Sequence, residues 1–224
     1  MDMLLVTFCV LFVTWIYFKT NPLEHSSKFM WRRFVNWFPL GMTYAFLYMG
    51  RYNLNVSKNA LGAMMSKEEF GWIFGLGTVV YGLSFLINGP LIDKIGGKKG
   101  ILIGAIGSSM ANILMGVATY FFLNGRLRWN LTATFAVLYS MNMFFQSYGA
   151  CSIIKVKAYW FHVRERGIFG AIFGTLISFG VYFAFDWGQA IADASKAHLA
   201  GAPTLFQKIF RDFAKLYLML EFIK

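Results

Sequence analysis

Arg51 lies inside an apolar run, residues 34–56, that is long enough to cross a lipid bilayer. An arginine at the bilayer centre costs about 2.5–3.5 kcal/mol, so such a residue usually faces a watery cavity, a partner charge or an anionic ligand. Tyr44 and Tyr48 precede it at helical spacing, which places two phenol hydroxyls and one guanidinium along one side of a helix. The spacing predicts an anion-binding site. The alternative is that the Arg51 side chain extends to the nearby lipid interface.

The helix that carries these residues is predicted to be one of several that cross a membrane. The chain is 58% hydrophobic and 14% charged, whereas soluble proteins have about 25% charged residues. The first of its apolar stretches is short for a bilayer core about 30 Å thick. We expect it to be an uncleaved anchor rather than a signal peptide, because neither a positive n-region nor a small-residue cleavage pattern flanks it. The six candidate spans are residues 3–18, 34–56, 70–92, 100–123, 132–154 and 167–188.

This pattern predicts an all-α integral membrane protein with four parts. Residues 1–20 form an N-terminal anchor helix, residues 21–33 a cytoplasmic linker, and residues 34–188 a unit of five core helices. Residues 189–224 combine a polar loop with an apolar stripe at helical spacing. That stripe is typical of an amphipathic helix in the membrane interface, and a truncated further span is the alternative.

Lysines and arginines gather in three loops, residues 19–33, 93–99 and 155–166. Cytoplasmic loops of membrane proteins carry the excess of positive charge, so these loops are predicted to be cytoplasmic in a multi-pass protein. The net charge of +11 does not indicate a nucleic-acid partner, because the positive residues lie in short loops and form no basic domain.

The sequence shows no pattern typical of an enzyme. Cys9 and Cys151 lie far apart within apolar stretches, where they are expected to pack as small hydrophobic residues. His25, His162 and His198 have no spacing that would build a metal site or activate a nucleophile. We therefore expect no metal, no cofactor and no catalytic residue.

The most specific motif lies between the third and fourth apolar stretches. Two adjacent glycines permit a sharp turn there, and an aspartate at the membrane edge can meet a nearby cation or a helix N-terminus. The motif residues are Gly89, Asp93, Lys94, Gly96, Lys98 and Lys99. The run resembles the G-x-x-x-D-[RK]-x-G-x-[RK]-[RK] signature of the major facilitator superfamily, between the second and third core helices.

Two further runs and one tyrosine carry a narrower resemblance. The first run is Tyr44-x-x-x-Tyr48-x-x-Arg51-x-Asn53, and the tyrosine is Tyr81. The second run comprises Gln146, Gly149, Lys155, Trp160, Phe161, Arg164, Glu165, Arg166 and Gly167. Over about residues 33–188 the chain is similar to the organophosphate:phosphate antiporters, which include glycerol-3-phosphate and hexose-6-phosphate transporters.

This resemblance implies a substrate site and a conformational motif. In the family, tyrosines of the first core helix precede an arginine that binds the substrate phosphate. The residues that match substrate-binding positions are Tyr44, Tyr48, Arg51, Asn53, Tyr81 and Gln146. Gln146 and Asn142 can instead form hydrogen bonds between helices. Glu165 and Arg166 are expected to form an ion pair that latches one conformation of the loop.

Three departures from the antiporter pattern bear on the substrate. Phe85 stands where glycerol-3-phosphate transporters carry a lysine, and residues 173–178 lack their histidine. Ala150 and Cys151 follow Gly149 in place of a Trp-Pro pair. The pattern therefore leaves the identity of the organophosphate open.

The resemblance implies exchange of an organophosphate, of the glycerol-3-phosphate or sugar phosphate type, for inorganic phosphate by alternating access in a bacterial inner membrane. The fold would be the N-terminal half of a transporter of two six-helix halves. Its partners would be the phosphorylated substrate, inorganic phosphate, the lipid bilayer, and either the missing C-terminal half or a second copy. A half-size carrier acting as a dimer and a membrane sensor without transport are the alternatives.

Overall fold

The computed structural model describes residues 2–61, 65–126 and 129–189, and within these ranges the chain is helical and contains no strand. The predicted amphipathic or truncated helix of residues 189–224 lies almost wholly outside the described residues. The elements are α1 (Asp2–Lys19), α2 (Ser27–Leu61), α3 (Lys67–Ile95), α4 (Gly97–Leu123), α5 (Leu131–Trp160), a 3₁₀ turn η1 (Val163–Glu165), α6 (Arg166–Tyr182) and a π-helical turn η2 (Phe183–Trp187).

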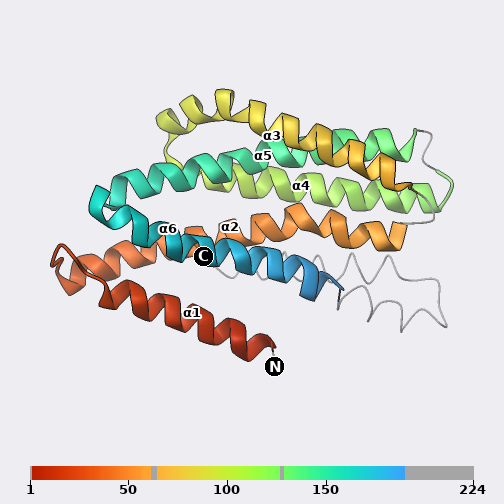
Figure 1. Ribbon diagram of the computed structural model, residues 1–224. Helices are drawn as coiled ribbons and strands as arrows, with labels where there is room; N and C mark the ends of the chain where they lie inside the picture. The colour runs from red at the N-terminus through yellow and green to blue at the C-terminus, as the bar shows by residue number, and fades with distance from the viewer. Residues whose placement is uncertain (1, 62–64, 127–128, 190–224) are drawn as a thin grey trace.

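The helices form one bundle in which successive helices run in opposite directions (Figure 1). Helices α3, α4 and α5 pack together, α2 packs beside α6, and α1 lies at the edge of the bundle against α6. The three loops predicted to be cytoplasmic consequently lie at the same end of the bundle, at the left in Figure 1.

Within the residues that the structure describes, three stretches are long and apolar enough to cross a membrane: Lys67–Ile95, Gly97–Leu123 and Val163–Trp187. Helices α2 and α5, with 35 and 30 residues, are long enough but carry polar side chains within their apolar sequence. Helix α5 buries several of these side chains inside the bundle, among them Asn142 and Gln146. The predicted all-α membrane fold is confirmed. By length and hydropathy, however, fewer helices among the described residues qualify as membrane spans than the six that the sequence predicted.

The predicted linker, residues 21–33, is helical in its second half. Helix α2 begins at Ser27 because the side chain of Ser26 accepts a hydrogen bond from the Phe29 amide at 3.3 Å, which satisfies a free N–H at the helix start. The connection between α1 and α2 is therefore shorter than predicted, and Arg33 belongs to the second turn of α2.

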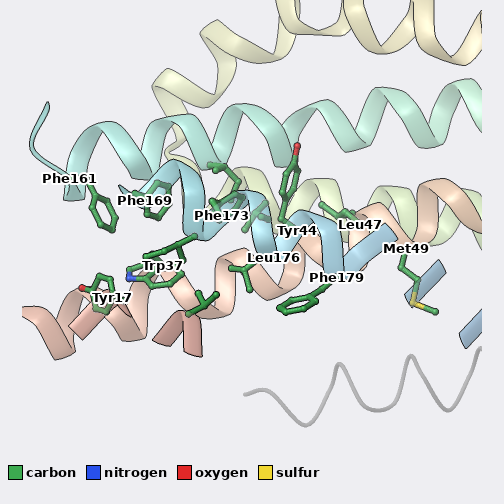
Figure 2. Packing of buried hydrophobic residues seen from close by; sticks show 14 of the residues in the cluster. Tyr17, Trp37, Tyr44, Leu47, Met49, Phe161, Phe169, Phe173, Leu176 and Phe179 are labelled. Atoms are coloured by element: carbon green, nitrogen blue, oxygen red, sulfur yellow. The ribbon is translucent and has the colours of Figure 1, made fainter. Parts of the chain in front are cut away.

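The core between α2 and α6 is rich in aromatic residues (Figure 2). Trp37 and Tyr44 of α2 contact Phe169 and Phe173 of α6, with ring centroids 5.7 Å apart in both pairs. Tyr17 of α1 adds its ring at 5.1 Å from Trp37. This packing fixes the axis of α2, the helix that carries Arg51.

The turn between α3 and α4 depends on Gly96. This residue has φ +85° and ψ 156°, a region that is essentially restricted to glycine, and it joins the two helices without a longer loop. The predicted role of the glycine in a sharp turn is confirmed.

Gly96→Ala is expected to lower the free energy of unfolding by about 1–3 kcal/mol, because a Cβ strains this backbone conformation. Thermal unfolding of the purified protein in detergent measures the effect. Gly116→Ala is the matched control, since Gly116 lies within α4 and an added Cβ there would meet nothing within 4 Å. A melting temperature that falls equally in both variants would contradict the prediction.

Candidate functional site

Arg51 lies on α2 with its guanidinium facing α5. Its Nε donates a hydrogen bond to Oε1 of Gln146 at 2.6 Å, although the two residues are separated by 95 positions in the sequence. Gln146 is fully buried and Arg51 is partly buried. The guanidinium therefore points into the bundle, which favours the predicted anion site over extension of the side chain to the interface.

Two tyrosine rings enclose the guanidinium. Its central carbon lies 4.6 Å from the ring centroid of Tyr48 on α2 and 4.4 Å from that of Tyr81 on α3. Such contacts are attractive because the face of an aromatic ring is electronegative. The rings hold the guanidinium plane between two helices without neutralising its charge.

Tyr44 completes the group from the same face of α2. Its ring meets that of Tyr48 edge to face, with centroids 5.1 Å apart. On the other side the Tyr44 ring lies against Gly149 of α5, where an added Cβ would come within 3.2 Å of ring carbons. A Cβ there would come still closer to the side chain of Leu47, so the glycine of the Gln146-x-x-Gly149 run makes room for both Leu47 and Tyr44.

One donor of Arg51 has no partner among the described residues. Nη2 is buried and makes no hydrogen bond there, whereas Nε is bonded to Gln146. A buried charged donor without a partner is costly, and an anionic oxygen is the group that a guanidinium binds most strongly. The buried Nη2, beside the rings of Tyr48 and Tyr81, is therefore a donor whose chemistry suits an oxygen of a small anion.

Asn53 does not join this cluster. Its Oδ1 lies 3.7 Å from where a Cβ on Gly188 would stand, so its side chain points toward the end of η2. Residues two apart on a helix project about 200° from one another, which explains why Asn53 and Arg51 face different neighbours. The structure thus separates Asn53 from the other predicted substrate-binding residues.

Phe85, which stands in the place of a lysine, lies one turn from Tyr81 on α3. The two rings meet edge to face with centroids 4.9 Å apart. This side of the cluster is therefore apolar where a lysine would have added a second positive charge.

The turn motif lies at the end of the bundle that holds the loops rich in positive charge. Asp93 at the end of α3 accepts a hydrogen bond from Nζ of Lys155 on α5 at 2.7 Å, which confirms that it meets a cation. Lys94, Lys98 and Lys99 are exposed around the turn at Gly96. Gly89 lies one turn before Asp93 in α3, with nothing within 4 Å of an added Cβ.

The predicted ion pair between Glu165 and Arg166 is wrong. Glu165 binds Arg33, with Nη1 and Oε2 2.9 Å apart, and its other oxygen lies 3.4 Å from Nε2 of His25. Arg166 instead donates to two backbone carbonyl oxygens, those of Phe161 and Ala158, at 3.3 Å each. Adjacent residues at a helix start project in different directions, so they do not face one another.

Arg33 is the residue that the sequence analysis missed. Only 1% of it is exposed, and besides Glu165 its guanidinium donates to the Tyr17 hydroxyl at 2.9 Å. It also lies over the ring of Phe161 at 4.5 Å. In the sequence Arg33 is one of several positive residues before a span, and its partner lies 132 positions away, so no local pattern distinguishes it.

Within the described ranges, no three histidine, cysteine, aspartate or glutamate side chains lie close enough to hold a metal ion. Cys9 and Cys151 are free thiols.

A family model described as the Major Facilitator Superfamily matches residues 3–196. The chain is 27% identical over 164 residues to the membrane sensor protein UhpC of Escherichia coli (strain K12), covering 72% of this chain and 35% of that protein. It is 22% identical over 163 residues to the probable hexose phosphate transport protein of Chlamydia trachomatis serovar D, covering 72% of this chain and 33% of that protein.

The UhpC protein of Salmonella typhimurium is 26% identical over 164 residues, covering 72% of this chain and 34% of that protein. The chain thus spans about a third of the length of the curated relatives that it matches. No solved structure is significantly similar to it. The similarity to these proteins agrees with the resemblance that the tyrosine and arginine motif carries. The family match extends over most of the described residues and includes the turn motif at Gly96, and the chain therefore belongs to the Major Facilitator Superfamily.

Proposed function

We propose that this chain forms the part of a membrane transporter that binds the phosphate group of a small phosphorylated molecule, with Arg51 as the principal ligand. The observation that supports this most directly is the buried Nη2 of Arg51, which has no partner among the described residues, beside the rings of Tyr48 and Tyr81. A guanidinium keeps its charge at every physiological pH and presents several donors in one plane, which suits the oxygens of a phosphate.

The transport step that we propose is exchange of a sugar phosphate or a similar organophosphate for inorganic phosphate. Both ligands carry the same phosphate group and can bind Arg51 in turn, each shifting the balance between inward-open and outward-open states. One matched relative is named a probable hexose phosphate transport protein. In such a mechanism a second set of helices, on the same polypeptide or on another copy, completes the site from the opposite side.

We place the protein in the inner membrane of a bacterium, with the loops around Arg33, Asp93 and Glu165 on the cytoplasmic side. The concentration of lysine and arginine at that end supports this orientation.

A second candidate is a membrane sensor that binds the same phosphorylated ligand without moving it across the membrane. Two of the matched relatives carry the name membrane sensor protein, and this observation favours the candidate. The same Arg51 cluster would serve both functions, because recognition of a phosphate precedes either response.

Phosphate counterflow separates these candidates. Liposomes that contain the purified protein and are loaded with unlabelled phosphate are expected to accumulate radiolabelled phosphate from outside, and external hexose phosphate should compete. Binding of labelled phosphate without accumulation would favour the sensor. A protein that neither binds nor exchanges phosphate or hexose phosphate would overturn the phosphate assignment.

A further inference from the structure

A buried polar network lies between α4 and α5, directly behind the Gln146 side chain. We propose that Asn142, supported by Ser108 and Asn112, is a positioning residue that fixes the amide of Gln146 and, through it, the guanidinium of Arg51. The proposal deepens the proposed function, on which it rests, because it names the residues that aim the phosphate ligand.

The hydrogen bonds of this network have a defined order of donors and acceptors. Nε2 of Gln146 donates to Oδ1 of Asn142 at 2.9 Å, and the Ser108 hydroxyl donates to the same oxygen. Nδ2 of Asn142 donates to Oδ1 of Asn112 at 3.4 Å, and Nδ2 of Asn112 donates to the Ser108 carbonyl oxygen at 3.1 Å. Each amide therefore has its oxygen and its nitrogen assigned by its neighbours.

The direction of these bonds determines what Arg51 meets. Because Oδ1 of Asn142 accepts two hydrogen bonds, it requires a donor from Gln146, and the Nε2 group of Gln146 supplies it. The Oε1 of Gln146 is then left to face Nε of Arg51 at 2.6 Å. A reversed amide would place an NH₂ group against the guanidinium, where neither group can accept. Nε2 of Gln146 also donates to the Ser108 hydroxyl oxygen at 3.3 Å, so Asn142, supported by Ser108, selects the amide orientation that Arg51 requires.

Burial makes this selection effective. Asn142 and Gln146 are 0% exposed and Ser108 is 2% exposed, so water cannot readily replace any of these partners. A buried donor or acceptor that loses its partner is costly, so the network favours one arrangement strongly over the others. With Nε held on Gln146, the buried Nη2, which has no hydrogen-bond partner among the described residues, is available to a ligand.

Helix α3 provides a matched control in Asn88. This asparagine is also 0% exposed, and its Nδ2 donates to Oγ of Ser147 on α5 at 2.6 Å and to the carbonyl oxygen of Phe144 at 3.3 Å. Asn88 resembles Asn142 in type and burial, and both asparagines bond to a neighbouring helix, but none of the hydrogen bonds of Asn88 leads to Arg51. Loss of either side chain should weaken helix packing to a similar extent, whereas only Asn142 should affect the guanidinium.

The test compares Asn142→Ala with Asn88→Ala in the purified protein expressed from its native gene. Isotope-labelled arginine gives an NMR signal for the Arg51 Nε–H, identified by its loss in Arg51→Lys. Asn142→Ala is expected to shift this signal and speed its exchange with water, and to weaken binding of inorganic phosphate about tenfold, the equivalent of one lost hydrogen bond. Asn88→Ala should change neither measurement. Ser108→Ala, which removes a single hydroxyl, is expected to act in the same direction to a smaller extent and serves if Asn142→Ala fails to fold.

The positioning role would be overturned if the Arg51 Nε–H signal were unchanged in Asn142→Ala. If Asn142→Ala does not fold, an unchanged signal in Ser108→Ala has the same meaning. Either result holds whether or not the wild type binds phosphate. A signal that responds equally to Asn88→Ala would also overturn it, because the effect would then come from general loosening of the bundle. A wild type that binds no phosphate or hexose phosphate would overturn the proposed function alone, and the NMR comparison would still decide the positioning role.

Discussion

In the complete transporter, replacing Arg51 with lysine is expected to abolish phosphate exchange while leaving membrane insertion unchanged. The guanidinium reaches Gln146 with Nε while Nη2 stays free, so it can hold its protein partner and a phosphate oxygen at the same time. A lysine ammonium is a compact charge without this planar fork, and it cannot reproduce both contacts in the same geometry. The ammonium also fits less well between the rings of Tyr48 and Tyr81, which reduces the affinity for phosphate further.

Counterflow in liposomes measures exchange, and the amount of protein recovered from the membrane fraction measures insertion. Arg32→Lys is the matched control, because Arg32 lies on the same helix but is exposed at its start. This control is expected to exchange phosphate normally. Near-normal exchange by Arg51→Lys would refute the assignment of Arg51 as the phosphate ligand.

Arg33→Met and Glu165→Gln are each expected to lower the free energy of unfolding by about 3–5 kcal/mol, because each leaves a buried charge without its partner. Arg33 is 1% exposed and Glu165 is 4% exposed, and the charged atoms are 2.9 Å apart. The double variant should recover most of the loss, since replacing both members of a buried ion pair by neutral groups is often close to neutral. Thermal unfolding in detergent gives all three values.

The exposed ion pair of Asp93 and Lys155 serves as a comparison for the buried pair of Arg33 and Glu165. Their side chains are 67% and 40% exposed, so Asp93→Asn should cost less than about 1 kcal/mol in stability. If the losses from Arg33→Met and Glu165→Gln simply add in the double variant, the two charges do not act as a pair.

Helical spacing was sufficient to predict the part of the site that lies on one helix. Tyr44, Tyr48 and Arg51 share a face of α2, because residues four and seven positions apart return to the same side of a helix. Tyr81 and Gln146 lie on other helices, and only the resemblance to a family placed them near Arg51. Local periodicity contains no information on which helix faces which, so the contact between Arg51 and Gln146 could not be derived from it.

The same limit explains what the sequence analysis missed. The partner of Glu165 was sought in the adjacent residue, whereas the structure supplies Arg33 from a distant helix start. Asn53 was included because it belongs to the run that resembles the antiporters, although its spacing of two positions from Arg51 turns it to another side of α2. Both corrections concern side-chain direction and long-range packing, which neighbouring sequence does not determine.

The polar residues of α5 also bear on how the protein is made. Besides hydrogen bonds within α5, the side chains of Asn142, Gln146 and Ser147 have partners on helices that precede α5 in the chain: Asn88 on α3, Ser108 and Asn112 on α4, and Arg51 on α2. Those helices are synthesised first, so α5 leaves the translocon into a bilayer that already contains its hydrogen-bond partners. Helix α5 can therefore be too polar to enter lipid by itself and still be inserted during synthesis, provided that the earlier helices remain next to the translocon.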